Sequence, residues 1–123
     1  MEITFTDREA DVMQILWECG PSVVAEVRAQ LRDELAYTTV QTVLRTLEAK
    51  GYVAHAEEGR GHRYHAAIEQ QQARKSALHH LTSKLFKGST ELLFAHLVSD
   101  RKLGADEIAR MRKLLAKADK EPK

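Results

Sequence analysis

Two short β-type segments in the middle of the chain most constrain what it can fold into. Residues 52–57 (YVAHAE) and 62–67 (HRYHAA) are compatible with strands, and the linker EGRG joins them. Its glycines allow the positive φ angles of a tight hairpin turn. The sequence on both sides has helical periodicity instead, so the hairpin has to pack against helices. We therefore expect a mainly α protein with one small β-hairpin.

Helical patterns before the hairpin predict three short helices in succession. Thr6 and Glu9 form a capping box that starts the first, which runs to about Glu18. Ser22 is expected to cap the second, which fades near Leu35. Three helices followed by a hairpin is the order of a winged helix-turn-helix domain. We assign this domain to residues 1–67.

The third predicted helix, within AYTTVQTVLRTLEAKG, is rich in β-branched residues that form helices poorly. Each costs up to roughly 0.7 kcal/mol relative to alanine, so packing or function has to offset the loss. We expect Thr38 to cap this helix and Gly51 to end it. Its apolar residues recur at i, i+3, i+4 and i+7 and are Val40, Val43, Leu44 and Leu47.

The opposite face of this helix has the composition of a surface that meets phosphates. No carboxylate occurs between Ala36 and Leu47, although the surrounding sequence is acidic. Threonine can contact phosphate or the thymine methyl, glutamine can pair with adenine, and arginine can pair with guanine in the major groove. The residues that we expect to bind DNA here are Thr38, Thr39, Gln41, Thr42 and Arg45.

The tip of the predicted hairpin adds cations beside this helix. Arg60 and Arg63 lie in EGRGHRY together with Tyr64. In that position they form a wing that can touch the DNA backbone or the minor groove. We expect Arg60 and Arg63 to bind DNA and to brace the wing.

Charge is distributed unevenly along the chain. The 19 basic and 18 acidic residues give a formal net charge of +1. Residues 1–67 contain 7 basic and 11 acidic residues, a net charge of −4, and the remaining 12 basic and 7 acidic residues give +5. The first half is therefore not a basic domain, and DNA binding has to rest on its local carboxylate-free face.

From Glu69 onward the pattern predicts three more helices, the second over about 89–99 and the third over about 105–118. Their apolar stripes have little to pack against within one copy, and a homodimer is the simplest way to bury them. We assign residues 68–123 to a helical dimerisation domain. The residues expected at its interface are Leu78, Leu81, Leu85, Leu93, Leu97, Ile108, Met111 and Leu115.

Several segments together resemble the penicillinase-repressor family, the BlaI/MecI group that also includes copper-responsive CopY repressors. They are LWECGPSVVAEV, AYTTVQTVLRTLEAKGYV, GRGHRYHA, LFKGSTELLFAHLV and LGADEIARMRKLL. The resemblance implies a dimeric winged-helix repressor that binds inverted-repeat operators in front of resistance or stress genes. It places the recognition positions on Thr38, Thr39, Gln41, Thr42 and Arg45, and the wing on Gly59 and Arg60.

Two departures from the family pattern bear on regulation. In penicillinase-type repressors a membrane-bound sensor protease triggers cleavage of an Asn-Phe bond, and the corresponding pair here is His96-Leu97. That pair does not favour the same cleavage. Copper-responsive members carry a C-terminal cysteine cluster, whereas this chain has no cysteine after Cys19. We expect no cofactor and no metal site.

Other functions are weighed against the repressor interpretation. Strand alternation places His62 and His65 on opposite faces, which disfavours a shared metal. The sequence contains no motif of a catalytic base, oxyanion hole or phosphate loop, so no enzyme is expected. The composition predicts a cytoplasmic protein that does not insert into a membrane. The competing hypothesis is a winged-helix scaffold that binds protein partners and ignores DNA, and a ligand-gated regulator is a third.

Overall fold

The computed structural model describes residues 2–100 and 102–120. Contacts divide the chain into two units, residues 1–80 and 81–123. The elements, in chain order, are α1 (Asp7–Cys19), β1 (Ser22–Val23), α2 (Val24–Gln30), α3 (Tyr37–Ala49), β2 (Val53–Glu58), β3 (Gly61–Ala66), α4 (Gln70–Leu85), α5 (Thr90–Asp100) and α6 (Ala105–Lys120).

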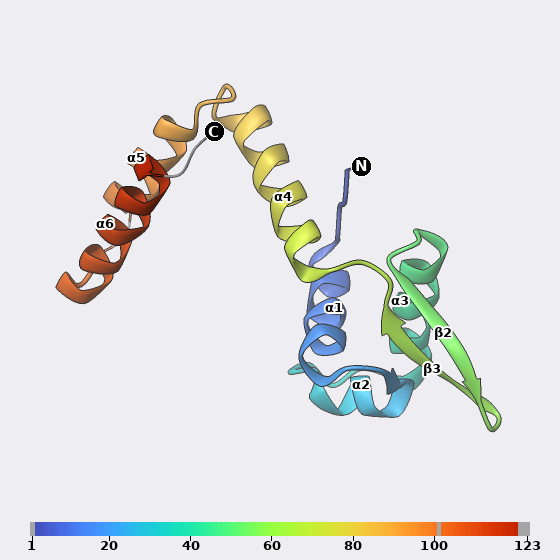
Figure 1. Ribbon diagram of the computed structural model, residues 1–123. Helices are drawn as coiled ribbons and strands as arrows, with labels where there is room; N and C mark the ends of the chain where they lie inside the picture. The colour runs from blue at the N-terminus through green and yellow to red at the C-terminus, as the bar shows by residue number, and fades with distance from the viewer. Residues whose placement is uncertain (1, 101, 121–123) are drawn as a thin grey trace. The chain divides into compact units, whose positions relative to one another are not determined.

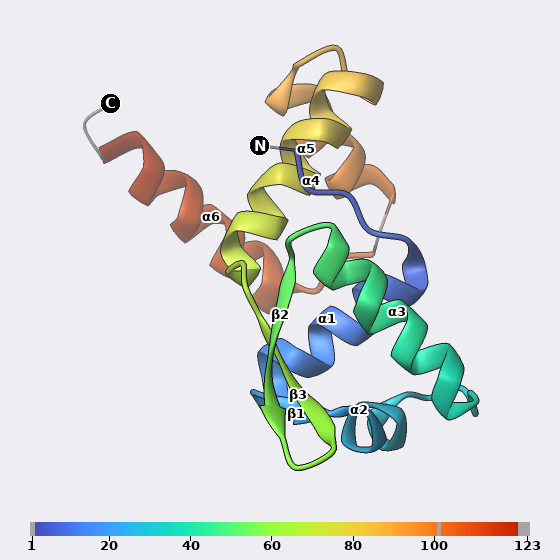
Figure 2. The ribbon, with the colours of Figure 1, turned by 90° about the vertical axis from the view of Figure 1, so that its right-hand side faces the viewer.

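The first unit is a winged helix-turn-helix. Helices α1, α2 and α3 pack beside a three-stranded antiparallel sheet in the order β1-β3-β2. In the hairpin, Val53 pairs with Ala66 and His55 pairs with Tyr64. The hairpin projects past the three helices (Figures 1 and 2). The fold predicted from the sequence, a mainly α domain with a hairpin wing, is confirmed.

The core of this unit brings together one apolar face from each helix and the base of the hairpin. Burial of a large apolar side chain contributes roughly 1.5–3 kcal/mol, more than the helix-propensity cost of any β-branched residue in α3. The poor helix formers of α3 are therefore stabilised by packing. The largest fully buried side chains are Tyr64, Met13, Leu44, Leu47, Val12, Val27 and Val40.

Helix α3 is terminated by Gly51, as the sequence predicts. Gly51 adopts a φ of 86°, which strains any residue with a Cβ atom. Its amide donates to the Glu48 carbonyl, and the next amide, of Tyr52, donates to the Leu47 carbonyl, both at 3.0 Å. This paired pattern satisfies carbonyls that would otherwise be open at the helix end. It also turns the chain directly into β2.

Two expectations about α2 are wrong. Ser22 does not cap it, because Ser22 lies in β1 and its hydroxyl donates to the Gly20 carbonyl at 2.8 Å. The Val23 amide instead donates to the Glu26 carboxylate at 3.0 Å. The helix also ends at Gln30 rather than near Leu35. Strand β1 was not anticipated, since two residues leave no periodic signal.

Helix α4 begins as part of the winged-helix unit. Ala73 is buried in the core, and the Ser76 hydroxyl accepts from the Ile3 amide at 2.8 Å. The Trp17 indole donates to the Ile68 carbonyl at 3.0 Å, which fixes the segment leading into α4. The two units therefore divide after His80, inside α4.

The second unit contains the end of α4 with α5 and α6. The Ser89 hydroxyl accepts from the Leu92 amide at 3.0 Å and so caps α5. Within this unit the Phe86 and His96 rings meet edge to face with centroids 5.3 Å apart. The predicted helices over about 89–99 and 105–118 are confirmed to within two residues at each end.

The buried Glu9 carboxylate connects the start of α1 with the end of α3. The Glu9 carboxylate accepts from the Thr6 amide at 2.8 Å, while the Glu9 amide donates to the Thr6 hydroxyl at 3.2 Å. The same carboxylate accepts from the Lys50 ammonium through both oxygens at 2.8 Å. Only 5% of the Glu9 side chain is exposed. Glu9 therefore caps α1 and holds the end of α3 against it.

Glu9→Gln should lower the free energy of unfolding by about 1–3 kcal/mol, because it leaves the Lys50 cation without its partner. Urea denaturation of the two proteins measures the difference. The matched control is Glu18→Gln, an exposed carboxylate on the same helix, which should change stability by less than about 0.5 kcal/mol. Equal effects of the two substitutions would contradict the anchoring role.

The same carboxylate makes stability depend on pH. Burial raises the pKa of Glu9, but the bonds and charge of Lys50 together with the bonds to Thr6 outweigh it and leave the pKa below 4.5. Because the pKa is lower in the folded state, the stabilisation is complete above about pH 4.5 and is lost as pH falls through the folded pKa. As pH falls below about 4.5, the free energy of unfolding should therefore decrease less in Glu9→Gln than in the parent protein.

Candidate nucleic-acid interface

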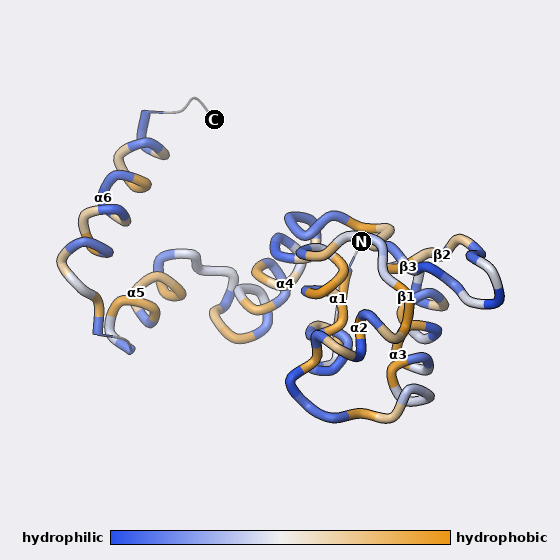
Figure 3. The backbone as a smooth tube through the Cα atoms, turned by 90° about the horizontal axis from the view of Figure 1, so that it is seen from below, coloured by the Kyte–Doolittle hydropathy of each residue, from blue (hydrophilic) through white to orange (hydrophobic). Residues whose placement is uncertain are grey.

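Helix α3 presents the carboxylate-free face to solvent. Figure 3 shows its hydrophobic residues turned toward α1 and α2 and its hydrophilic residues on the opposite side. Of the residues expected to bind DNA, Gln41 is half-buried, and the exposed ones are Thr38, Thr39, Thr42 and Arg45. Hydroxyl, amide and guanidinium groups thus share one surface of a single helix.

The N-terminus of α3 differs from the prediction in one respect. Thr38 does not cap the helix, because α3 begins at Tyr37 and Ala36 occupies the N-cap position. No side chain caps this end, and its first turn contains no acidic residue. The first amides of α3 are thus compatible with a phosphate.

The hydroxyls of α3 are not all free to donate outward. The Thr42 hydroxyl donates to the Thr38 carbonyl one turn earlier at 2.9 Å. A threonine that bonds back in this way leaves its methyl group and its oxygen lone pairs at the surface. Thr42 is therefore better suited to a thymine methyl than to donating a hydrogen bond to a phosphate.

The wing contains one free cation and one bound cation. Gly59 has a φ of 61° at the turn, whereas Gly61 needs no positive φ. Arg60 follows Gly59 at the exposed tip and forms no ion pair with the described residues. Arg63 is engaged instead. It pairs with Glu58 of the hairpin and, at 3.1 Å, with Glu26 of α2.

Arg63 also donates to the Pro21 carbonyl at 3.1 Å, so three segments converge on its guanidinium. Its hydrogen bonds lower the pKa of the Glu58 carboxyl. Of the two roles expected for Arg63, these bonds match the bracing of the wing and compete with a DNA contact. They also place one cation between two carboxylates, so that the three groups together carry a net charge of −1.

A cluster of side chains between the hairpin and α3 was not recognised from the sequence. His55 of β2 contacts the Glu48 carboxylate of α3 through Nδ1, at 2.6 and 2.8 Å. The His55 ring stacks on His62 with centroids 4.0 Å apart and planes 1° apart. The Tyr64 ring lies 5.6 and 6.0 Å from these two rings, tilted by 53°, and is 1% exposed. The only sequence signal was strand alternation, which places these three residues on one face of the hairpin.

His62 and His65 follow the predicted alternation along β3. His62 pairs with Glu57 and His65 pairs with Ala54, so the two histidines lie on opposite faces. Across residues 2–100 and 102–120, no three histidine, cysteine or acidic side chains converge as a metal site.

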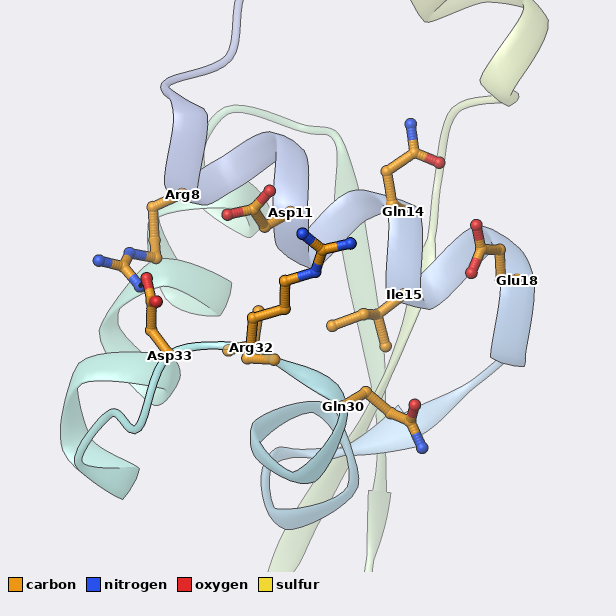
Figure 4. Close-up of a pocket in the computed structure, with 9 residues that line it drawn as sticks. Arg8, Asp11, Gln14, Ile15, Glu18, Gln30, Arg32 and Asp33 are labelled. Carbon is orange, nitrogen blue, oxygen red and sulfur yellow. Dashed lines mark hydrogen bonds and ion pairs between the residues drawn. The ribbon is translucent and has the colours of Figure 1, made fainter.

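An open groove between α1 and the end of α2 has mixed charge (Figure 4). Arg8 pairs with Asp33 at 3.2 Å across it. Arg32 points toward α1, where Asp11 and Glu18 add carboxylates. The groove is polar and open, which does not favour the ligand-gated alternative.

The residues expected at a dimer interface are mostly exposed in a single chain. The exposed ones are Leu78, Leu81, Leu85, Leu97, Ile108 and Leu115, whereas Met111 is half-buried. Leu93 is 8% exposed, so it already packs within its own unit. Leu92, Phe94, Val98 and Leu114 are further exposed apolar side chains that the prediction did not include.

The sequence profile of the family described as penicillinase repressor matches residues 5–117. The chain belongs to the penicillinase repressor family. This confirms the resemblance drawn from the motifs of the wing, of α3 and of the C-terminal helices. Proteins of this family are transcriptional repressors rather than enzymes.

Two curated relatives agree with this assignment. The transcriptional regulator BlaI of Mycobacterium tuberculosis is 35% identical over 118 residues, which cover 92% of this chain and 83% of BlaI. The penicillinase repressor of Bacillus licheniformis is 24% identical over 112 residues, which cover 89% of this chain and 88% of that protein.

Solved structures of transcriptional regulators share the fold of this chain. The regulator Tm0710 of Thermotoga maritima matches with a TM-score of 0.55 at 19% identity, over 93% of this chain and 73% of that chain. A mutant MarR from E. coli, complexed with operator DNA, matches with a TM-score of 0.50 at 20% identity, over 93% of this chain and 75% of that chain. No helix in the described ranges is long and apolar enough to cross a membrane.

Arg45→Ala should cost about 1–3 kcal/mol of binding free energy on the preferred DNA sequence and relax the choice of one base pair in each half-site. A bidentate arginine contact to guanine is lost on that sequence alone. Arg110→Ala, an exposed arginine in α6, is the matched control and should leave binding unchanged. A uniform loss on all sequences would make Arg45 a phosphate contact instead.

Arg60→Ala and Arg63→Ala should affect binding differently. A plot of log DNA affinity against log salt concentration has a negative slope. Loss of Arg60 should reduce the magnitude of that slope by about 1, as expected for one phosphate contact. Loss of Arg63 should leave that slope unchanged and lower the urea midpoint only slightly, since its carboxylate partners are solvent-exposed. Binding titrations at several salt concentrations, with urea denaturation alongside, separate the two roles. Identical slopes for both variants would contradict the assignment.

Proposed function

We propose that this member of the penicillinase repressor family is a homodimer that binds a pseudo-palindromic DNA operator and represses transcription by occluding a promoter. The observation that carries the proposal is the exposed face of α3, which combines Thr38, Thr39 and Arg45 without any carboxylate. It stands beside a wing whose tip carries the free cation Arg60. Such a protein acts in the cytoplasm, where its operator lies.

The groups on α3 fit direct readout in the major groove. Arg45 pairs with guanine through O6 and N7, and Gln41 pairs with adenine through N6 and N7. The Thr42 methyl group packs against a thymine methyl group. The first amides of α3 and Arg60 hold phosphates on either side of the contacted bases.

Internal pairing makes an acidic domain compatible with this role. Residues 1–67 carry a net charge of −4, which repels DNA at long range. Three acids near the interface are held by partners within the domain: Glu48 by His55, and Glu26 and Glu58 by Arg63. These three carboxylates therefore point toward partners within the domain, and Arg63 offsets the charge of one of the two acids that it contacts.

A second copy of the chain is the partner that the C-terminal helices require. Leu85 is 73% exposed, Leu97 50% and Leu115 54%, which is unusual for residues of this size. A two-fold dimer buries the same surface of both copies and presents two α3 helices to one face of DNA. An operator with inverted half-sites about one helical turn or a multiple of it apart follows from that symmetry.

The regulated genes are proposed from the resemblance and from the names of the relatives, which point to antibiotic-resistance or stress genes. A membrane-bound sensor protease is the further partner that the resemblance adds. His96 and Leu97 are both exposed on α5. A sensor protease that serves this repressor has to accept that pair in place of Asn-Phe.

Selection of duplexes from a random pool by the purified protein tests the proposal. Enrichment of an inverted repeat, with affinity that falls steeply as salt rises, is the expected result. Absence of enrichment together with salt-independent behaviour would overturn it and favour the protein-binding scaffold, whose best feature is the exposed apolar surface of α5.

The dimer is tested by sedimentation of Leu97→Asp. A charge at this exposed apolar position should shift the protein toward monomer and weaken binding to the full operator more than to one half-site. Ser83→Asp, at an exposed polar position of α4, is the control and should stay dimeric. A monomeric parent protein would contradict the homodimer.

A further inference from the structure

The segment before α1, residues 2–6, is neither helix nor strand, and the operator-binding role proposed above does not use it. Its apolar side chains enter the core of the winged-helix unit. Ile3 is 7% exposed, and the Phe5 ring meets the Trp17 and Tyr52 rings edge to face, with centroids 6.3 and 5.2 Å apart. The segment is therefore anchored to this unit by packing.

The same segment also contacts α4 through two polar groups. The Ile3 amide donates to the Ser76 hydroxyl at 2.8 Å. The Glu2 carboxylate lies 2.6 Å from Nδ1 of His80, one turn further along α4. All four residues belong to the winged-helix unit, and Figure 1 shows the segment beside the first turns of α4. We call residues 2–5 the N-terminal strap.

Other contacts hold the start of α4 against the same unit. The Trp17 indole donates to the Ile68 carbonyl, and the Gln70 side-chain amide donates to the Gln14 side-chain oxygen, both at 3.0 Å. Ala73 is buried in the core. These contacts reach the first turn of α4, and the strap extends the attachment to the second and third turns.

Helix α4 runs without a break from Gln70 to Leu85 and so passes from the first unit into the second. A helix of this length is a rod of about 24 Å, whose direction is set by the contacts along its first turns. The residues after His80 lead to the helices that carry the exposed apolar side chains. In a two-fold dimer built on those helices, a change in the direction of α4 moves both α3 helices.

We propose that the N-terminal strap is a positioning element for the dimer, which fixes the direction of α4 and thereby the half-site spacing that the repressor accepts. This inference rests on the proposed function, because it concerns how the dimer meets an inverted repeat. The strap residues act through α4 and need not touch DNA.

The geometry of DNA makes such a device useful. Adding one base pair between two half-sites separates them by about 3.4 Å more and rotates one against the other by roughly 34°. A dimer whose α3 helices are held at one separation fits few spacings. A dimer with a loosely held α4 fits more of them, but loses more conformational entropy on binding.

A distance measurement without DNA tests the first step. Cys19 is the single cysteine of the chain and is exposed at the end of α1, so a spin label on it reports the separation of the two winged-helix units in a dimer. The parent protein should give a narrow distance distribution. Ser76→Ala removes the acceptor of the Ile3 amide and should broaden it. Ser83→Ala, an exposed serine further along α4, is the matched control and should leave the width unchanged.

Glu2→Ala is a second variant that leaves the core intact, because 61% of the Glu2 side chain is exposed. It removes the contact with His80 and should also broaden the distribution. Its matched control is Glu18→Ala, which removes an exposed carboxylate from the last turn of α1. The double variant Ser76→Ala with Glu2→Ala should give a broader distribution than either single variant.

Operators with one base pair added or removed between the half-sites test the second step. The parent protein should bind the selected spacing more tightly than either altered spacing. In the double variant this ratio of affinities should fall about three- to tenfold, as expected for one hydrogen bond. Affinity for a single half-site should stay unchanged. A merely structural role would instead lower the urea midpoint and weaken binding to every DNA equally.

The outcomes separate this inference from the proposed function. Equal distance distributions in the parent protein and the strap variants overturn the positioning role and leave the repressor role intact, as does a broad distribution in the parent protein. An unchanged spacing preference in the double variant overturns it as well. If the parent protein enriches no inverted repeat or is monomeric, the proposed function fails and the spacing role fails with it.

Discussion

The winged-helix unit depends on the hydrogen bonds and the ion pair of the Glu9 carboxylate. It caps α1 through Thr6 and, in the same place, neutralises Lys50 at the end of α3. The Glu9 side chain is only 5% exposed, so its carboxylate would be destabilising there without the bonds from Lys50. Packing of Val12, Met13 and Leu44 then follows from the position of α3 on α1. The presentation of the opposite face of α3 to solvent is a consequence of this arrangement.

The distribution of ion pairs explains how a domain with a net negative charge presents a surface suited to phosphate. The acids Glu26, Glu48 and Glu58 are engaged by Arg63 and His55. These pairs lie at a partly exposed surface, where each contributes little to stability. Their larger effect is local, since Arg63 offsets part of the negative charge of Glu26 and Glu58 and the Glu48 carboxylate is bonded to His55. Arg45 and Arg60 form no ion pair with the described residues, as their proposed contacts with DNA require.

The sequence predicts what depends on local pattern. The Thr6–Glu9 capping box, the glycine at the end of α3, the hairpin and the three C-terminal helices are confirmed, because each is determined by neighbours within a few residues. The face of α3 that meets solvent is also predicted correctly, since 100° periodicity separates it from Val40, Leu44 and Leu47.

Features that depend on distant residues were not predictable in the same way. Ser22 and Thr38 are good capping residues in isolation, but a β-pair with Tyr64 and an earlier start of α3 take precedence. The ion pair of Arg63 with Glu26, 37 positions away in the sequence, could not be predicted from local pattern. The first turns of α4 joined the winged-helix unit because Ser76 lies beside Ile3, 73 positions away in the sequence.

The central claim, that the carboxylate-free face of α3 enters the major groove, is tested most directly by methylation interference on the selected operator. Dimethyl sulfate marks guanine at N7 in the major groove and adenine at N3 in the minor groove. The account predicts that methylation of guanines in both half-sites blocks binding. Interference confined to adenines, or absent from the half-sites, would contradict it.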